Sequence, residues 1–293
     1  MTAASGRVAL TVSPNGIVFD LPEIVALEEG IFDRAGLDVI RLASASQWTQ
    51  SPDVPVLGRL KESLYEQGSA DVYNLCEWGS IDRAERTARG ARIAYLRPAV
   101  VAQAIVSFDD ALQEPHDLAG VAVGVNEYTG SHYITLHLLE GTLRQDQIVV
   151  QHVGGRRLER LREGEVRAVA LMEPYISLAL KQGAHVIATY YYRGAEIIAP
   201  DLDEQARTRF VAALNEAVDL INAKPRRYVG KLLEPIEGEL SLDDLSLDYF
   251  RYVHATPFPE QRFTESYQWM RSWGLTEGGN DFASLVATEG SAR

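Results

Sequence analysis

Short apolar runs alternate with amphipathic stretches along the first part of the chain, which predicts strands alternating with helices. The apolar runs Val8 to Val12 and Leu37 to Leu42 are typical of buried strands. Between them, residues 21–35 carry apolar side chains at helical spacing, with Pro22 suited to a first turn and Gly36 at the end. The order strand, helix, strand predicts a βαβ unit and therefore a parallel sheet.

The alternation continues to about residue 200, and helices dominate after it. We expect further strands at 72–75, 93–96, 100–107, 121–125, 148–153, 168–172 and 185–192. Further helices are expected at 55–67, 81–88, 131–139, 155–163, 173–182, 203–223, 228–233, 242–253 and 259–273, and a loose tail from about 279. This order favours two α/β lobes, the second inserted into the first, followed by a helical C-terminal third.

The most informative segment is the strand at 121–125 with the polar loop 126–130 and the helix that follows. This order directs the loop amides and the unpaired N–H groups of the first helical turn at one point. Such a point attracts a carboxylate, sulfonate, phosphate or another negatively polarised group. An ordinary turn before a well-capped helix gives the same pattern, so the interpretation depends on the rest of the chain.

Composition excludes several classes of partner and site. The 28 Lys and Arg against 41 Asp and Glu give a net charge of −13, which argues against nucleic acid or an anionic membrane. The single cysteine, Cys76, excludes an internal disulfide and a Cys-rich metal site. No apolar run is long enough to insert in a membrane. The N-terminus shows no basic and apolar leader before Val8, so we expect a cytoplasmic protein unless a leader was removed.

Four motifs occur in an order that resembles a known family. They are Glu23 to Val39, Gln67-Gly-Ser-Ala-Asp-Val72, Asp117 to Val125, and Leu161-Arg-Glu-Gly-Glu-Val166 followed by Ala170-Leu-Met-Glu-Pro-Tyr175. They resemble landmarks of the class II periplasmic-binding-protein fold, within it the alkanesulfonate, taurine and thiamine-pyrimidine group. The resemblance covers about residues 8–200 and implies an α/β fold of two lobes with a ligand cleft between them. By analogy, lobe one is 1–100 plus 196–293 and lobe two is 101–195.

The loops at the carboxyl ends of the strands supply ligand contacts in such a fold. A small anionic or polar organic ligand is the expected partner, and an importer permease is expected only if a leader was removed. The candidate ligand-binding residues are Asn15, Phe19, Asp20, Trp48, Asn74, Trp78, Tyr128, Thr129, Gly130, Ser131, Glu173, Tyr175, Tyr192 and Arg193.

Three residues are candidates for catalysis. Cys76 and Glu77 follow a strand and can form a nucleophile and base pair, while His132 lies on the first turn of the anion-type helix. A thiolate needs a nearby cation or helix N-terminus, whereas an ionised Glu77 close by would raise the thiol pKa. A lone cysteine is also commonly a buried apolar group.

Metals and cofactors are not expected, because no phosphate or dinucleotide loop is present and four of the histidines show no metal spacing with one another, namely His116, His152, His185 and His254. Two functional hypotheses therefore remain. The first is a cytoplasmic enzyme, a lyase or hydrolase acting on a small anionic, possibly aromatic or heterocyclic substrate. The alternative is the substrate-binding component of an ABC importer for a sulfonate, taurine or pyrimidine-precursor-like ligand, without catalysis. A ligand sensor is a third possibility without specific support.

Overall fold

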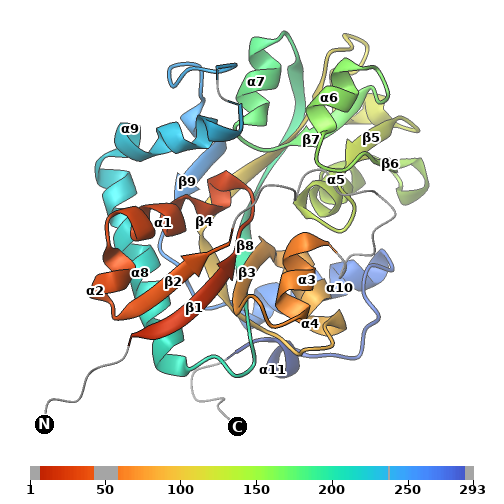
Figure 1. The fold of residues 1–293 in the computed structure, drawn as a ribbon. Coiled ribbons are helices and arrows are strands. Elements are labelled where there is room, and N and C mark those ends of the chain that lie inside the picture. The colour runs from red at the N-terminus through yellow and green to blue at the C-terminus, as the bar shows by residue number, and fades with distance from the viewer. Residues whose placement is uncertain (1–6, 43–58, 237, 288–293) are drawn as a thin grey trace, which may run out of the picture.

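One mixed β-sheet runs through the whole molecule in the computed structural model, which describes residues 7–42, 59–236 and 238–287 (Figure 1). Its nine strands follow the order β2-β1-β3-β8-β4-β7-β5-β6, and β9 pairs with β4. The strands are β1 (Val8–Ser13), β2 (Leu37–Arg41), β3 (Val72–Cys76), β4 (Arg92–Ser107), β5 (Ala122–Val125), β6 (Val149–His152), β7 (Ala168–Leu171), β8 (His185–Ile198) and β9 (Phe250–Tyr252).

The two lobes share the long antiparallel strands β4 and β8, of 16 and 14 residues. Parallel strands β1, β2 and β3 continue the sheet on one side, and β5, β6 and β7 continue it on the other. The expected βαβ unit and two-lobed α/β architecture are therefore confirmed. The boundaries at 100/101 and 195/196 fall inside the shared strands and stay a prediction.

Helices cover both faces of this sheet (Figure 1). They are α1 (Ile17–Glu28), α2 (Ile31–Arg34), α3 (Leu60–Glu66), α4 (Glu77–Arg86), α5 (Gly130–Glu140), α6 (Arg157–Arg162), α7 (Tyr175–Lys181), α8 (Glu204–Ala223), α9 (Pro225–Tyr228), α10 (Glu260–Ser272) and α11 (Phe282–Leu285). The part of the chain that the structure describes contains no helix that is both long and apolar enough to cross a membrane.

Several expected elements differ from those observed. The helix expected at 242–253 is wrong, because this segment contains a 3-10 turn and strand β9, in which Phe250 and Tyr252 are buried and Arg251 is exposed. The strands expected at 93–96 and 100–107 form one strand, β4, whose register shifts between Leu96 and Val100. The segment expected to be a loose tail contains α11, capped by Asp281.

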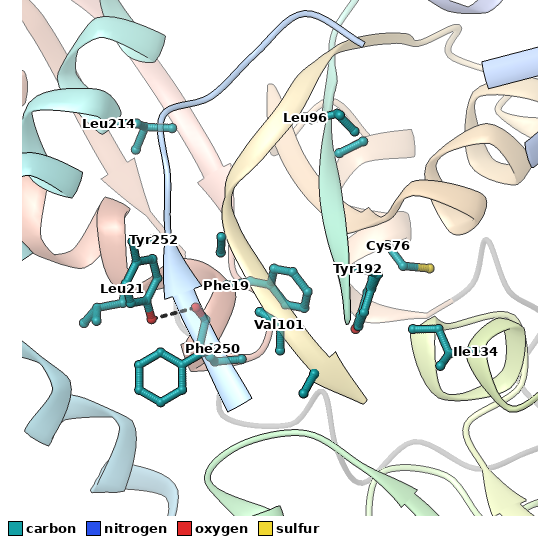
Figure 2. Packing of buried hydrophobic residues seen from close by; sticks show 14 of the residues in the cluster. Phe19, Leu21, Cys76, Leu96, Val101, Ile134, Tyr192, Leu214, Phe250 and Tyr252 are labelled. Carbon is teal, nitrogen blue, oxygen red and sulfur yellow. Dashed lines mark hydrogen bonds between the residues drawn. The ribbon is translucent and has the colours of Figure 1, made fainter. Parts of the chain in front are cut away.

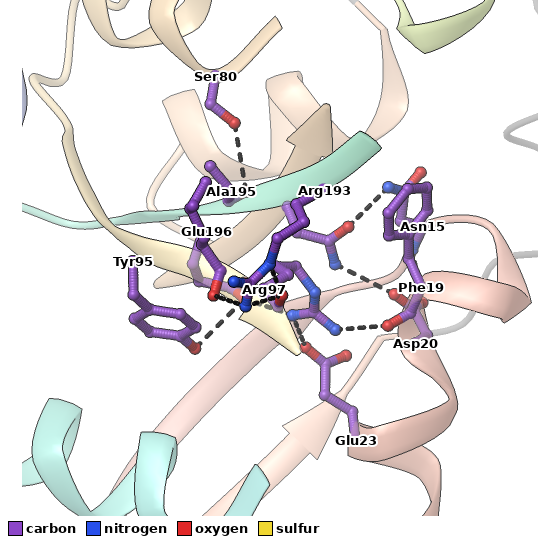
Figure 3. Close-up of polar contacts among 12 residues, drawn as sticks. Asn15, Phe19, Asp20, Glu23, Ser80, Tyr95, Arg97, Arg193, Ala195 and Glu196 are labelled. Carbon is purple, nitrogen blue, oxygen red and sulfur yellow. Dashed lines mark hydrogen bonds and ion pairs between the residues drawn. The ribbon is translucent and has the colours of Figure 1, made fainter. Parts of the chain in front are cut away.

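The hydrophobic core continues across the shared strands, so the lobes are packed together near the cleft (Figure 2). Phe19 of α1 and Tyr192 of β8 meet edge to face, with ring centroids 5.5 Å apart. Next to them, Arg97 is fully buried and pairs with Glu23 and Glu196, and it donates to the carbonyl of Phe19 (Figure 3). This cluster fixes the start of α1 against β4 and β8.

Candidate functional site

A cavity of about 80 Å³ lies between the lobes, where the carboxyl ends of β1 and β3 face the loop after β5. An outer chamber of about 410 Å³ adjoins it and shares Asn15, Arg157 and Met172 with its lining. The inner cavity is lined by Asn15, Phe19, Arg59, Leu60, Lys61, Glu62, Leu75, Cys76, Asn126, Thr129, Gly130, Arg157, Met172 and Tyr192. Both lobes contribute, as expected for a ligand cleft in this architecture.

Three cationic side chains line the cavity. Lys61 donates to Asn15 Oδ1 at 3.2 Å and to the Asn74 carbonyl at 3.1 Å. From the other lobe, the buried Arg157 donates to the carbonyls of Ala170 and Gly154, and burial lowers its pKa to about 10. Burial likewise lowers the pKa of Arg59 and of Lys61. Cations held by neutral carbonyls make the cavity attractive to an anion.

The N-terminus of α5 adds backbone donors to the same cavity. Thr129 and Gly130 line it, and the amides of Gly130 and Ser131 donate to no acceptor within the described residues. The side chain of Ser131 accepts from the Asn126 amide at 2.9 Å, and Thr129 Oγ1 donates to the Asn126 carbonyl at 2.6 Å. These bonds close the turn and leave the first-turn amides available to a negative group.

The two residues inside this turn, Glu127 and Tyr128, are held from both lobes. The amides of Glu127 and Tyr128 donate to Nδ1 of His152 and of His132, each at 3.2 Å. Their carbonyls accept from lobe one: Glu127 from Arg59 at 2.7 Å, and Tyr128 from Arg83 at 2.8 Å. Tyr128 has a φ of +56°, a conformation that costs free energy in a non-glycine residue. The surrounding contacts therefore maintain a strained loop beside the ligand cavity.

A polar network supports the lobe-one wall of the cavity (Figure 3). Asn15 donates its side-chain amide to Asn74 Oδ1 at 2.6 Å, and Asn74 donates to Asp20 Oδ1 at 3.1 Å. Asp20 also accepts from the backbone amide of Asn15 at 2.6 Å and from the guanidinium of Arg41 at 2.7 Å. Of these predicted ligand residues, Asn15 lines the cavity, whereas Asp20 and Asn74 act behind it by fixing Asn15 and Lys61.

Gly130 is required by the close approach of Tyr192. A Cβ at Gly130 would lie 2.5 Å from the Tyr192 hydroxyl and 3.0 Å from Cζ. We expect Gly130→Ala to lower the free energy of unfolding by about 1–3 kcal/mol, because the side chain has no space. Urea denaturation measures this.

Gly141→Ala, at the C-terminal end of the same helix, is the matched control, because its Cβ would meet nothing within 4 Å. Adding Tyr192→Phe to Gly130→Ala is expected to recover part of the loss. Equal stability of the Gly130 and Gly141 variants would contradict this account.

The proposed catalytic loop does not converge on the cavity. Cys76 does line it, but its Sγ accepts from the Gly79 amide at 3.3 Å as the N-cap of α4, and burial raises the thiol pKa to about 12. Glu77 instead pairs with Arg262 at 2.5 Å. Trp78 is buried among aromatic rings that include Tyr133 and Trp269. The reason is that α4 starts directly after β3, so successive side chains point in different directions.

The other predicted residues divide among three locations. Thr129, Gly130 and Tyr192 line the inner cavity, and Glu173 and Tyr175 line the outer chamber. Glu173 accepts from the Ser177 amide and hydroxyl, and burial raises its pKa to about 7. Arg193 lines neither space.

Arg193 donates to the carbonyls of Leu96, Arg97 and His254. These bonds hold β8 to β4 and to the segment that follows β9. Tyr128, Ser131 and His132 shape the loop, and Trp48 lies outside the described residues.

Comparison with family models gives no match, and comparison with curated proteins gives none. Solved structures do match. The alkanesulfonate-binding protein of Xanthomonas axonopodis pv. citri, bound to MOPS, has a TM-score of 0.71 at 14% identity over 94% of this chain and 96% of that one. The periplasmic aliphatic sulphonate-binding protein of Escherichia coli has a TM-score of 0.67 at 16% identity, over 95% and 97%.

A desulfurization enzyme also matches, with a TM-score of 0.63 at 15% identity over 97% of both chains. The chain therefore has the periplasmic-binding-protein fold, which confirms the resemblance that its motifs indicate. The same fold includes binding proteins and an enzyme, so it does not decide the function.

Proposed function

We propose that this protein is a solute-binding protein that holds a small organic anion between its lobes. One observation carries the proposal: three cations and the first-turn amides of α5 meet at one cavity in a chain of net charge −13. The positive potential is therefore local, as a binding site for an anion requires. The inner cavity has room for an anionic headgroup and the outer chamber for an organic tail, since one water needs roughly 10–15 Å³.

The experiment is calorimetric titration of the full chain with methanesulfonate, acetate and methyl phosphate, and with neutral methanesulfonamide as the matched control. At least one anion is expected to bind, and the neutral sulfonamide is not, because it lacks the charge that the cations select. Proton NMR after prolonged incubation is expected to show an unchanged ligand. Equal binding of the neutral compound, or no binding of any anion, would contradict the proposal.

Catalysis in the same cleft is the second candidate, and one observation favours it: the thiol of Cys76 lines the cavity. A thiol with a pKa of about 12 is protonated at neutral pH and is a poor nucleophile. Glu77 is engaged by Arg262 and does not line the cavity. Loss of a small anion from the NMR spectrum, abolished by Cys76→Ala, would favour this candidate. The cytoplasmic location and delivery to a permease stay predictions.

A further inference from the structure

The ligand cavity carries more positive charge than its surroundings neutralise. Glu62, the carboxylate that lines the cavity, lies 3.4 Å from Arg83, and Asp20 behind the wall lies 2.7 Å from Arg41. Arg83 also pairs with Asp82 at 2.6 Å, and Asp82 pairs in turn with Arg86 at 2.6 Å. The three carboxylates are therefore balanced by three other guanidinium groups. Three cations remain, and none of them forms an ion pair with a carboxylate of the described residues. They are Arg59, Lys61 and Arg157.

Neutral partners orient these three cations without neutralising them. Arg59 and Arg157 donate to backbone carbonyls, and Lys61 donates to an amide oxygen and a carbonyl. Unpaired cations are costly to remove from water, so a bound anion relieves that cost. A singly charged ligand leaves two of the three uncompensated. A doubly charged ligand leaves only one of the three cations uncompensated. The same ligand also meets the amide donors of α5.

The size of the cavity places both charges on one group. All three cations line the same space of about 80 Å³, whereas the larger chamber beside it shares only Arg157 with them. We propose that the site prefers a dianion with one tetrahedral headgroup, a phosphate monoester or phosphonate, over a singly charged sulfonate or sulfate ester. This inference rests on the proposed function and adds the charge and headgroup of the ligand.

Methyl phosphate and methyl sulfate test the proposal, because they have the same shape and differ by one charge at neutral pH. At pH 7.5 we expect methyl phosphate to bind at least about 30-fold more tightly than methyl sulfate. The reason is that one additional charge contact in a partly buried site raises the affinity by more than about tenfold. At pH 5 the ratio is expected to fall to a few-fold, because a phosphate monoester takes up a proton near pH 6. Burial raises the pKa of Glu173 in the adjoining chamber to about 7, so its protonation removes a negative charge as the pH falls and favours the dianion, which opposes the expected fall. His132, with a pKa of about 4, is mostly neutral at both pH values.

Variants identify the cavity as the source of the preference. Lys61→Met removes one of the three cations and is expected to lower the ratio at pH 7.5 by about tenfold. Lys224→Met, at an exposed position after α8, is the control and keeps the wild-type ratio. An unchanged ratio in Lys61→Met would overturn the assignment of this cavity.

Three results would overturn the proposed ligand class. The first is methyl sulfate binding as tightly as methyl phosphate or more tightly. The second is tighter binding of malonate, whose two charges lie on two groups, than of methyl phosphate. Tighter binding of inorganic phosphate than of methyl phosphate would overturn the organic ester. In each of these cases an anion still binds, so the proposed function stands. The proposed function fails separately if no anion binds at all, neither these four nor methanesulfonate or acetate.

Discussion

Replacing Arg157 by Met is expected to weaken binding of the tightest-binding small anion at least about 100-fold. Truncating one member of a buried, hydrogen-bonded charge pair commonly costs 2–5 kcal/mol. Arg157 is 5% exposed, lines both the inner cavity and the outer chamber, and has no ion pair with a carboxylate of the described residues. A bound anion would be its charge partner. Calorimetric titration of the wild type and the variant measures the effect.

The stability of the ligand-free protein separates a binding role from a structural one. Burial disfavours the charged guanidinium of Arg157, so its removal relieves a desolvation cost while two carbonyls, of Gly154 and Ala170, lose their donor. These effects oppose each other, and we expect the free energy of unfolding to change by less than about 2 kcal/mol. Arg156→Met, at the exposed N-cap of the same helix, should change neither quantity. A loss of stability clearly larger than this in Arg157→Met, with unchanged anion affinity, would show a structural role instead.

The sequence predicted the half of the cleft that depends on backbone geometry. A strand, a polar loop and a helix in succession place the amides of Gly130 and Ser131 at one point, whatever the side chains do. The structure has this arrangement, with α5 starting at Gly130 beside the cavity. The ordered motifs also predicted the two lobes correctly, because short local patterns determine a βα unit.

The cationic half was not predicted, because nothing local distinguishes the arginine that enters the cavity. Arg156 and Arg157 are adjacent at the start of α6, yet one is exposed and the other buried. One signal was available: Arg157 lies four residues before the buried Leu161 and so shares its helical face. For Arg59 and Lys61, the helix expected at 55–67 gave no reason to face the cleft. Their roles depend on contacts with the distant Glu127 and Asn74.

The prediction for the Cys76 loop depended on where one element ends. It assumed that a loop follows β3, so that Cys76, Glu77 and Trp78 all reach the cleft. The helix α4 instead begins at Glu77, and Cys76 serves as its N-cap. A capping interaction of this kind is more commonly made by Ser, Thr, Asp or Asn, so the cysteine gave no signal of a helix start. If a longer loop had followed β3, Cys76, Glu77 and Trp78 could all have reached the cleft, as the catalytic hypothesis requires.

Acid is expected to destabilise this protein through His132, whose Nδ1 accepts from the Tyr128 amide. Burial, together with the nearby His152 and Arg59, lowers the pKa of His132 from 6.5 to about 4. A protonated Nδ1 also cannot accept the Tyr128 bond. The unfolded chain binds this proton near pH 6.5, whereas the folded protein binds it only near pH 4. The contribution of His132 to stability is therefore present above pH 6.5 and is lost as the pH falls toward 4. It amounts to about 3 kcal/mol over that window.

His132→Asn separates the hydrogen bond from the charge, because the asparagine Oδ1 takes the place of Nδ1 as an acceptor but does not titrate. Urea unfolding between pH 7 and pH 4 is expected to show a decline in stability about 3 kcal/mol smaller than in the wild type. His132→Leu also removes the titration, but it leaves the Tyr128 amide unpaired, so it should lose about 1–3 kcal/mol already at pH 7. The Tyr128 carbonyl would still be held by Arg83, and the residue would keep its strained φ with one fewer contact to maintain it. Anion affinity at pH 7 should then fall in the leucine variant and be retained in the asparagine variant. A decline with acid in His132→Asn as steep as in the wild type would assign the acid sensitivity to other groups.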